Sequence, residues 1–523
     1  MSEEIKHTQE REEVHRAIWA IANDLRGAVD GWDFKNYVLG AMFYRYISET
    51  LTNYINSIEA EAGNPKFNYA DIPDEKAEFL REDMVQEKGY FILPSELFAS
   101  VRSRAIGDAN LNVTLHQIFR NIEDSAKGSE AEDKFRGLFA DFDVNSNKLG
   151  SSVPKRNERL RKLLEGIAEM QLGSVDEHYI DALGDAYEYL MAMYASNAGK
   201  SGGEFFTPSD VSELLTKLGT AGKSSIRKIY DPACGSGSLL LKAINIPSLE
   251  VSEFYGQEIN ITTFNLCRMN MFLHGIGFER FSIACDDTLI SPHYWDEKPF
   301  DLIVSNPPYA IRWIGDDNPL LINDPRYAPA GVLAPKGKAD FAFIMHALSW
   351  LSEDGTAAIV CFPGIMYRGG AEQTIRKYLV DNNFVDSVIQ LPENLFFGVG
   401  IATCILVMKK NRTDNRILFI DASNEYVKAT NNNRLSPENI RRIVEVFSER
   451  REEEKFSVLV GADEVAREEY NLSAGRYVDS GDGKSEVDIV KLNAEIREIV
   501  AREEELRREI DAIVAEIEGS EGE

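Results

Sequence analysis

Residues 300–309 read Phe-Asp-Leu-Ile-Val-Ser-Asn-Pro-Pro-Tyr, an apolar run that stops at an asparagine and two prolines. Short apolar runs that end at a turn signal are typical of strands buried inside a parallel sheet. Open α/β sheets of this kind bind their ligands at the carboxyl ends of the strands. The stretch therefore predicts a buried parallel strand, followed by a loop at residues 306–309 that lies where a ligand would bind.

The groups in this loop suit a planar amine. Asn306 offers an amide oxygen, Pro307 keeps a carbonyl although it lacks an amide hydrogen, Pro308 stiffens the backbone, and Tyr309 offers a flat ring. Two acceptors can hold the two hydrogens of an exocyclic amine while the ring stacks on the heterocycle that carries it. An ordinary turn is the alternative interpretation, because Asn-Pro and Pro-Pro are common turn dipeptides.

The surrounding sequence alternates strands and helices from about residue 204 to residue 425. Strands are expected at 226–230, 253–256, 281–284, 301–304 and 357–361, with a hairpin formed by 385–391 and 403–408. This alternation predicts a doubly wound α/β fold with a parallel sheet. Residues 10–165 show helical spacing of apolar side chains instead, as at Val14, Ile18, Ile21 and Leu25. We expect a helical domain at 1–165, the α/β domain at 166–425, a helical connector at 426–480 and a terminal helix at 481–523.

The terminal helix carries a heptad pattern. Its apolar residues alternate at spacings of three and four, broken only by Glu503: Ile489, Leu492, Ile496, Ile499, Leu506, Ile510, Ile513 and Ile517. Four heptads of this quality favour a coiled coil or helical bundle with a partner. The alternative is a long solvated surface helix.

Composition limits the possible partners. The 523-residue chain has a formal net charge of −29. A protein that grips DNA alone normally presents a basic surface, because contacts to phosphates supply most of the non-specific affinity. Either the chain binds no nucleic acid, or a partner provides much of the grip.

The cysteine pattern and the apolar runs indicate a cytoplasmic protein. Five scattered cysteines without Cys-x-x-Cys spacing favour reduced thiols over disulfides or zinc. We find no apolar run of about 18 residues that would span a membrane. The charged start of the chain lacks the apolar core of a signal peptide.

Three further loops follow expected strands and suit a nucleoside ligand. Asp231 to Ser238 contains Gly235 and Gly237, which let the backbone approach a ligand closely. This loop lacks the Lys-Ser/Thr of a phosphate loop, and Leu240 breaks the dinucleotide pattern, so a nicotinamide cofactor is disfavoured. Glu258, about twenty residues further on, can accept hydrogen bonds from ribose hydroxyls. Asp286 or Asp287 can bind an adenine amine, and the sequence does not say which.

These elements, in this order, resemble S-adenosylmethionine-dependent amino-methyltransferases. The chain as a whole resembles the modification subunit of type I restriction–modification systems, in the N6-adenine DNA methyltransferase family. The segments that carry this resemblance are 25–27, 37–40, 185–190, 202–208, 470–473 and 476–478. Two departures from the family pattern are Asp286, where glycine is usual, and Tyr309, where phenylalanine is frequent.

The resemblance implies a Rossmann-like methyltransferase fold, a cofactor and a set of site residues. Asn306, Pro307, Pro308 and Tyr309 would form the catalytic loop, and no metal is expected. The residues that would hold S-adenosylmethionine are Glu204, Phe205, Phe206, Thr207, Pro208, Ser209, Asp231, Ala233, Gly235, Ser236, Gly237, Ser238, Glu258, Asp286 and Asp287.

The resemblance also implies partners. They are DNA, a specificity subunit that binds two modification subunits, and optionally a restriction subunit. Cytosine C5 methylation is disfavoured, because no proline immediately precedes a cysteine. Methylation of cytosine N4, protein glutamine or ribosomal RNA, and a scaffold with an inactive site, remain alternatives at this point.

Overall fold

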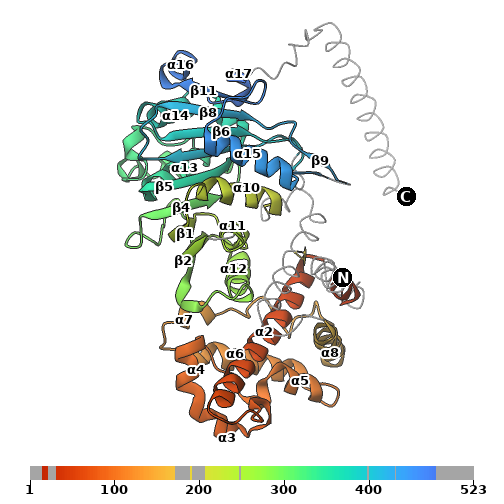
Figure 1. The fold of residues 1–523 in the computed structure, drawn as a ribbon. Coiled ribbons are helices and arrows are strands. Elements are labelled where there is room, and N and C mark those ends of the chain that lie inside the picture. The colour runs from red at the N-terminus through yellow and green to blue at the C-terminus, as the bar shows by residue number, and fades with distance from the viewer. Residues whose placement is uncertain are drawn as a thin grey trace, which may run out of the picture.

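The computed structural model describes residues 15–21, 31–170, 189–190, 207–246, 249–396, 400–429 and 432–478. A helical N-terminal unit lies beside an α/β unit built on a nine-stranded sheet (Figure 1). The predicted coiled-coil helix at 481–523 lies outside the described residues.

The N-terminal unit is helical, as predicted. Its α-helices are α2 (Gly31–Glu61), α3 (Asp74–Ala77), α4 (Arg81–Lys88), α5 (Phe98–Arg104), α6 (Leu111–Ser125), α7 (Glu132–Phe135) and α8 (Val153–Glu169). Helix α6 buries one apolar face that includes Leu115, Ile118, Phe119 and Ile122. The Phe119 ring stacks on Phe139 with a centroid distance of 4.4 Å. The helical spacing read from the sequence thus corresponds to one shared aromatic and aliphatic core.

The sheet of the α/β unit contains the seven predicted strands and two that were not predicted, at 416–421 and 457–461. Its strands are β1 (Ser225–Asp231), β2 (Glu250–Glu258), β3 (Phe281–Cys285), β4 (Phe300–Ser305), β5 (Leu351–Cys361), β6 (Val385–Gln390), β7 (Cys404–Lys409), β8 (Arg416–Asp421) and β11 (Ser457–Gly461). They lie in the order β11-β8-β6-β7-β5-β4-β1-β2-β3. Strands β3, β2, β1, β4 and β5 pair in parallel. Strand β7 runs antiparallel between β5 and β6, as the predicted hairpin requires.

Helices cover both faces of this sheet, which makes the fold doubly wound. Along β4, Leu302 and Val304 belong to one apolar core with the buried residues of α10 (Ser209–Thr220), α11 (Ser238–Lys242), α12 (Ile261–Leu273) and α15 (Pro437–Glu449). Ile303 belongs to the opposite core. That core contains buried residues of α13 (Asp340–Trp350), α14 (Ala371–Asp381), α16 (Ala462–Arg467) and α17 (Ala474–Tyr477). Burial on both faces explains why the strand is an unbroken apolar run.

One part of the predicted domain plan is wrong. Residues 426–480 were expected to be a helical connector, but β11 lies within them and pairs antiparallel with β8. A small ribbon, β9 (Val427–Lys428) with β10 (Asn433–Arg434), also lies in this range. The short run Ser457 to Gly461 continues the sheet beyond β8, whose free edge would otherwise expose unpaired backbone groups.

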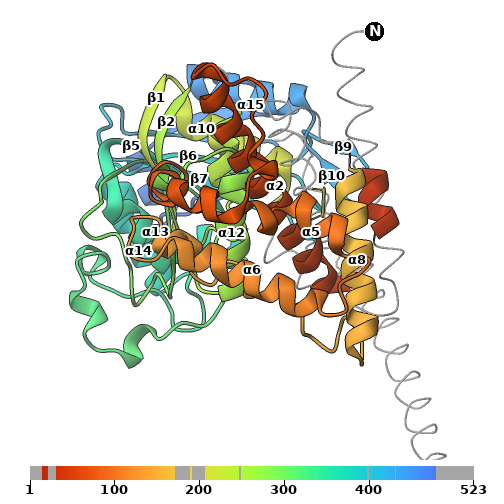
Figure 2. The same ribbon diagram turned by 90° about the horizontal axis from the view of Figure 1, so that it is seen from below.

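A polar latch joins the helical unit to α12. The Arg268 side chain is 1% exposed. Its Nη1 donates to the carbonyl oxygens of Asp133, Lys134 and Arg136 at 3.0, 3.2 and 3.0 Å. Asn265 Nδ2 donates to an Asp141 carboxylate oxygen at 2.8 Å. Helix α2 also contacts α12, and the view from below shows α2 beside α12 (Figure 2).

We expect Arg268→Ala to loosen this junction. The change leaves three partly buried carbonyl groups without their charged donor, and we expect a loss of about 2–4 kcal/mol in stability. Arg136→Ala is the matched control, because Arg136 pairs with Asp133 at the exposed surface and such pairs contribute about 0–1 kcal/mol. Thermal unfolding and the rate of subtilisin cleavage near residues 133–141 measure the difference. Equal unfolding temperatures and equal cleavage rates for the two variants would contradict a stabilising role of Arg268 at this junction.

Candidate functional site

The four loops singled out in the sequence meet at one edge of the sheet. Strands β3, β2, β1 and β4 are parallel neighbours. Their carboxyl ends lead into residues 286–289, 258–260, 231–238 and 306–309. The structure therefore brings the predicted ligand-binding loops and the Asn-Pro-Pro-Tyr loop together.

Asp231 links the ends of β1 and β4. Its Oδ1 accepts hydrogen bonds from Ser305 Oγ at 2.8 Å and from the Ala233 amide at 3.0 Å. Its Oδ2 is buried and has no hydrogen-bond partner. Burial raises the pKa of this carboxyl to about 7. The end of β1 thus holds a buried acceptor that lacks a donor, and such a group favours a ligand that supplies one.

The glycine loop after β1 divides into an inner and an outer part. Gly237 has φ +80°, and a Cβ there would lie 2.8 Å from Cys267 Sγ of α12. Asn270 Nδ2 also donates to the Ser236 carbonyl at 2.9 Å. These contacts pin Ser236 and Gly237 against α12. Ala233, Gly235 and Ser238 remain partly exposed.

Glu258 lies at the carboxyl end of β2 and faces this loop. Its two carboxylate oxygens accept hydrogen bonds from the amides of Gly235 at 3.0 Å and Asn260 at 2.8 Å. Burial raises the pKa of this carboxyl. Each carboxylate oxygen has a second lone pair, so the group can still accept hydrogen bonds from two hydroxyls.

Asn306 sits immediately after β4 with both ends of its side-chain amide engaged. Its Nδ2 donates to Thr207 Oγ1 at 3.1 Å. Its Oδ1 accepts a hydrogen bond from the Tyr309 hydroxyl. Tyr309 was expected to offer a stacking ring, yet here its ring packs against the core and its hydroxyl occupies the acceptor meant for an amine. Asn306 Oδ1 has a second lone pair, so a ligand amine either shares this oxygen with the Tyr309 hydroxyl or replaces it.

Asp340 at the start of α13 holds the exit of this loop. Both of its carboxylate oxygens accept from the Ala310 amide, at 3.3 and 3.2 Å. Ala310 has φ +49°, a left-handed conformation that is uncommon for residues with a side chain. The buried carboxylate fixes that turn, and with it the direction in which the chain leaves Tyr309.

Comparison with known proteins places this arrangement in a family. The N-6 DNA Methylase family model matches residues 178–486, and the HsdM N-terminal domain model matches residues 14–167. The type I restriction enzyme MpnII methylase subunit of Mycoplasma pneumoniae is 50% identical, with 98% of each chain covered. The chain belongs to the N-6 DNA methylase family of type I methylase subunits.

Two further relatives agree with this assignment. The MjaVII methylase subunit of Methanocaldococcus jannaschii is 32% identical, covering 69% of this chain and 63% of the relative. The structure of a type I restriction-modification methyltransferase subunit from Streptococcus thermophilus aligns with a TM-score of 0.80 and 35% identity, covering 90% of this chain and all of that one. The family resemblance drawn from the sequence is confirmed, and with it an adenine-specific DNA methyltransferase on the fold of the S-adenosylmethionine-dependent class.

The structure also distinguishes the two neighbouring aspartates of this methylase. Asp286 accepts hydrogen bonds from Ser291 Oγ at 2.8 Å and His293 Nε2 at 3.2 Å. The Ser291 bond lowers the pKa of Asp286. Asp287 is more buried, which raises its pKa, and its Oδ1 caps its own turn by accepting from the Leu289 amide. One carboxylate oxygen of Asp286 is thus already hydrogen-bonded to Ser291 and His293. This favours Asp287 as the residue that contacts a ligand.

A buried arginine that sequence reasoning missed holds the Asp287 loop in place. Arg326 is 1% exposed, and it donates to the carbonyls of Thr288 at 2.7 Å and Leu289 at 2.8 Å. It also contacts His346, whose pKa is well below its usual value because of burial and the nearby Arg326 charge. A neutral His346 beside Arg326 avoids a second buried positive charge. Arg326 also pairs with Asp324, two residues away, at 2.8 Å. No periodicity or short motif marks Arg326, because the contacts that hold the Asp287 loop are 37 and 38 residues away.

Ile259 is another residue that the sequence analysis missed. It follows Glu258 directly, yet its side chain is 69% exposed. An exposed apolar side chain beside a nucleoside-binding acid is suited to contact a flat base. Its position immediately after Glu258, the acid at the end of β2, is the feature of the sequence that could have identified it.

Some predicted residues fall elsewhere. Glu204, Phe205 and Phe206 lie outside the described residues. Thr207 and Pro208 are buried immediately before Ser209, where α10 begins. Within the described ranges, no helix is long and apolar enough to cross a membrane, and no group of three acidic, histidine or cysteine side chains could hold a metal ion.

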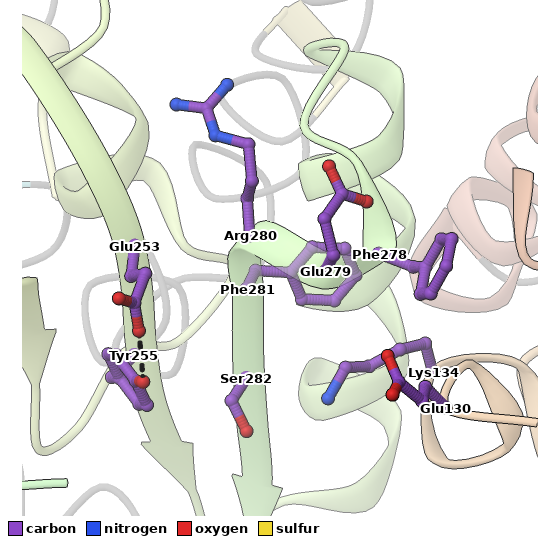
Figure 3. Close-up of a pocket in the computed structure, with 9 residues that line it drawn as sticks. All are labelled: Glu130, Lys134, Glu253, Tyr255, Phe278, Glu279, Arg280, Phe281 and Ser282. Atoms are coloured by element: carbon purple, nitrogen blue, oxygen red, sulfur yellow. Dashed lines mark hydrogen bonds between the residues drawn. The ribbon is translucent and has the colours of Figure 1, made fainter. Parts of the chain in front are cut away.

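A cleft of about 210 Å³ lies away from this edge (Figure 3). It is lined by the early parts of β2 and β3, where the Tyr255 hydroxyl donates to Glu253 at 2.5 Å, and by Lys134 of the helical unit. None of the predicted site residues lines it.

The unpaired Asp231 oxygen leads to a pH prediction. The unfolded carboxyl has a pKa of about 4, so between about pH 4 and pH 7 the folded protein keeps a proton that the unfolded chain has lost. This difference in proton binding makes the free energy of unfolding depend on pH. The contribution of Asp231 to that free energy is greatest below about pH 4, falls as the pH rises to about 7, and is constant above that. The free energy of unfolding of wild type relative to Asp231→Asn should fall by a few kcal/mol between pH 5 and 8, as urea titrations will measure. Parallel curves for the two proteins would contradict the buried, proton-holding Asp231.

Proposed function

We propose that this chain is the modification subunit of a type I restriction–modification complex. It transfers a methyl group from S-adenosylmethionine to N6 of an adenine that has been flipped out of duplex DNA. The observation that carries the proposal is the position of Asn306 and Pro307 at the end of β4, directly beside the β1 loop. An amine held there lies next to any ligand held by Asp231 and Glu258.

The residues at the edge of the sheet fit the proposed cofactor. The buried, unpartnered Asp231 Oδ2 suits an ammonium donor such as that of the methionine moiety. Glu258 suits the two ribose hydroxyls, and Asp287 together with the exposed Ile259 suits the adenine ring and its amine. When bound, S-adenosylmethionine supplies an electrophilic methyl group. The chain supplies the position and orientation of the group that attacks it.

Asn306 and Pro307 prepare the adenine amine for attack. The N6 lone pair is delocalised into the ring, so the amine is a poor nucleophile. Asn306 Oδ1 and the Pro307 carbonyl accept its two hydrogens and favour a pyramidal nitrogen whose lone pair points at the methyl group. When the cofactor is bound, the new N–C bond would form as the S–C bond breaks, and the extra proton of the methylated amine would pass to water. Positioning carries most of the rate in such an in-line transfer.

The base must leave the duplex for this to happen, and Tyr309 must move. Enzymes that modify a base extrude it and stack it on aromatic side chains. The Tyr309 hydroxyl holds the Asn306 oxygen in the free protein. The arriving amine takes over this acceptor, and the Tyr309 ring becomes available to stack on the adenine.

The net charge of the chain and its C-terminal heptad pattern both support association with a partner subunit. A chain of net charge −29 is a poor DNA binder alone. We propose that a specificity subunit reads the target sequence, that two copies of this chain bind it, and that residues 481–523 pack on its helices. A restriction subunit can join this complex.

We predict that efficient methylation of adenine requires the specificity subunit. The complex is incubated with duplex DNA and radiolabelled S-adenosylmethionine, and the digested nucleosides are separated by chromatography. We expect the label in N6-methyladenine. The isolated chain should methylate at least about tenfold more slowly, because without the specificity subunit the free energy of DNA binding weakens by more than about 1.4 kcal/mol. Label in N4-methylcytosine, or efficient site-specific methylation by the chain alone, would refute the corresponding part of the proposal.

Asn306→Ala removes one of the two acceptors. We expect the methylation rate to fall by at least about a hundredfold, in line with the loss of a group that orients the reacting atoms. Binding of S-adenosylmethionine, measured by calorimetry, should stay within about threefold of wild type. A variant that retains near wild-type methylation while binding cofactor would show that Asn306 is not the acceptor.

Two substitutions separate the two roles of Tyr309. Tyr309→Phe keeps the stacking ring and removes the hydroxyl that occupies Asn306, so methylation should stay within about threefold of wild type. Tyr309→Ala removes the ring, and loss of base–aromatic stacking of about 1–3 kcal/mol should lower the rate about 10- to 100-fold. The comparison uses single-turnover rates with saturating DNA. Equal losses in both variants would show that the hydroxyl, rather than the ring, is what the reaction needs.

A further inference from the structure

Thr207 contacts the side chain that grips the target amine. Its Oγ1 accepts the hydrogen bond from Asn306 Nδ2 at 3.1 Å, and Thr207 is 7% exposed. The sequence led us to expect a cofactor contact from Thr207, whereas this bond is directed to the catalytic loop. The two residues are 99 positions apart in the chain.

The orientation of the Asn306 amide matters for the reaction. The oxygen and nitrogen ends of a carboxamide have nearly the same shape, but one accepts hydrogen bonds and the other donates them. If the group turned over, its NH₂ would face the NH₂ of adenine, with donors opposing donors. Thr207 and Tyr309 hold opposite ends of the amide in the free protein. Once Tyr309 gives way to the base, Thr207 is the side chain that still restrains the nitrogen end.

The fold places Thr207 on the same support as Asn306. Helix α10 begins two residues after Thr207 and packs on β4 and β5. Near its other end, a Cβ on Gly219 would lie 2.3 Å from Leu302 Cδ1 of β4, so the helix sits directly on the strand that ends at Asn306. Asp210 further fixes the start of α10, because its Oδ2 accepts from the Leu435 amide at 2.6 Å.

We propose that Thr207 is a positioning residue for methyl transfer. Its hydroxyl oxygen accepts the hydrogen bond from Asn306 Nδ2 and so restrains rotation of the carboxamide, which leaves Oδ1 available to the adenine amine. This inference rests on the proposed function. A valine at position 207 has nearly the same shape but would leave the Asn306 NH₂ group against a methyl group. The carboxamide would then be free to rotate about its Cβ–Cγ bond.

The test measures binding and turnover separately in the assembled complex with the specificity subunit. Thr207→Val should lower the single-turnover methylation rate about 10- to 100-fold. The dissociation constant of S-adenosylmethionine from calorimetry and the KM for DNA should stay within about twofold of wild type. Thr207→Ser keeps the hydroxyl and should recover at least a third of the wild-type rate.

Thr220→Val is the matched control. Thr220 lies on the same helix, is 6% exposed, and donates its hydroxyl hydrogen to the Thr216 carbonyl at 2.8 Å, away from Asn306. Its methylation rate should equal that of wild type. Thr207→Ala serves as a second variant if the valine lowers the thermal unfolding midpoint by more than the control does.

Three outcomes would overturn the proposal. These are an unchanged rate in Thr207→Val, a loss confined to S-adenosylmethionine affinity, and a serine variant as slow as the valine variant. The second outcome would assign Thr207 to the cofactor instead. Failure of the proposed function is distinguishable, because the wild-type complex would then produce no N6-methyladenine.

Discussion

The parallel pairing of β1 with β4 is the constraint on which the rest of the site depends. The register sets Ile229 opposite Leu302 and Tyr230 opposite Ile303, so both strands end at the same level. The Ser305–Asp231 hydrogen bond then joins the two ends where the loops begin. Because of this pairing, the glycine loop and the Asn-Pro-Pro-Tyr loop face each other although about seventy residues separate them. The sheet thereby holds the two candidate ligand-binding loops side by side, as the proposed methyl transfer requires, since proximity of reactants accounts for much of the rate in group transfer.

Side chains and backbone amides of the protein itself satisfy the polar groups of the candidate site. Asn306 is bonded at both ends by Thr207 and Tyr309, Glu258 by two amides, and Asp231 by Ser305 and one amide. Each of these groups would otherwise lie largely unpaired at a partly buried edge, which is costly. Two sites differ in what a ligand must do. The Asp231 Oδ2 atom lacks a partner and is ready for a donor, whereas the Asn306 oxygen already accepts a hydrogen bond from the Tyr309 hydroxyl.

The sequence predicts the sheet well because strands buried on both faces appear as unbroken apolar runs, as at residues 300–305. It also predicts that the candidate site residues lie at strand ends, which is where the structure places Asp231, Glu258 and Asn306. Strands β8 and β11 were not predicted, and the five residues of β11 stand between helices and form a strand only by pairing with the edge of β8. Arg326 was missed because the contacts by which it holds the Asp287 loop are buried and distant in the sequence. For Tyr309, the sequence offers a ring but cannot say that the hydroxyl is bonded to Asn306. The choice between Asp286 and Asp287 likewise depends on the 291–293 turn, which only the folded chain reveals.

A structure of the assembled complex with DNA and a non-reactive analogue of S-adenosylmethionine tests the central claim most directly. The account predicts an extruded adenine whose N6 lies about 3 Å from both Asn306 Oδ1 and the Pro307 carbonyl oxygen, within ordinary hydrogen-bond distance. It also predicts that the Tyr309 hydroxyl has left Asn306 and that its ring lies against the base. An adenine bound elsewhere, with the Tyr309–Asn306 hydrogen bond still intact, would contradict it.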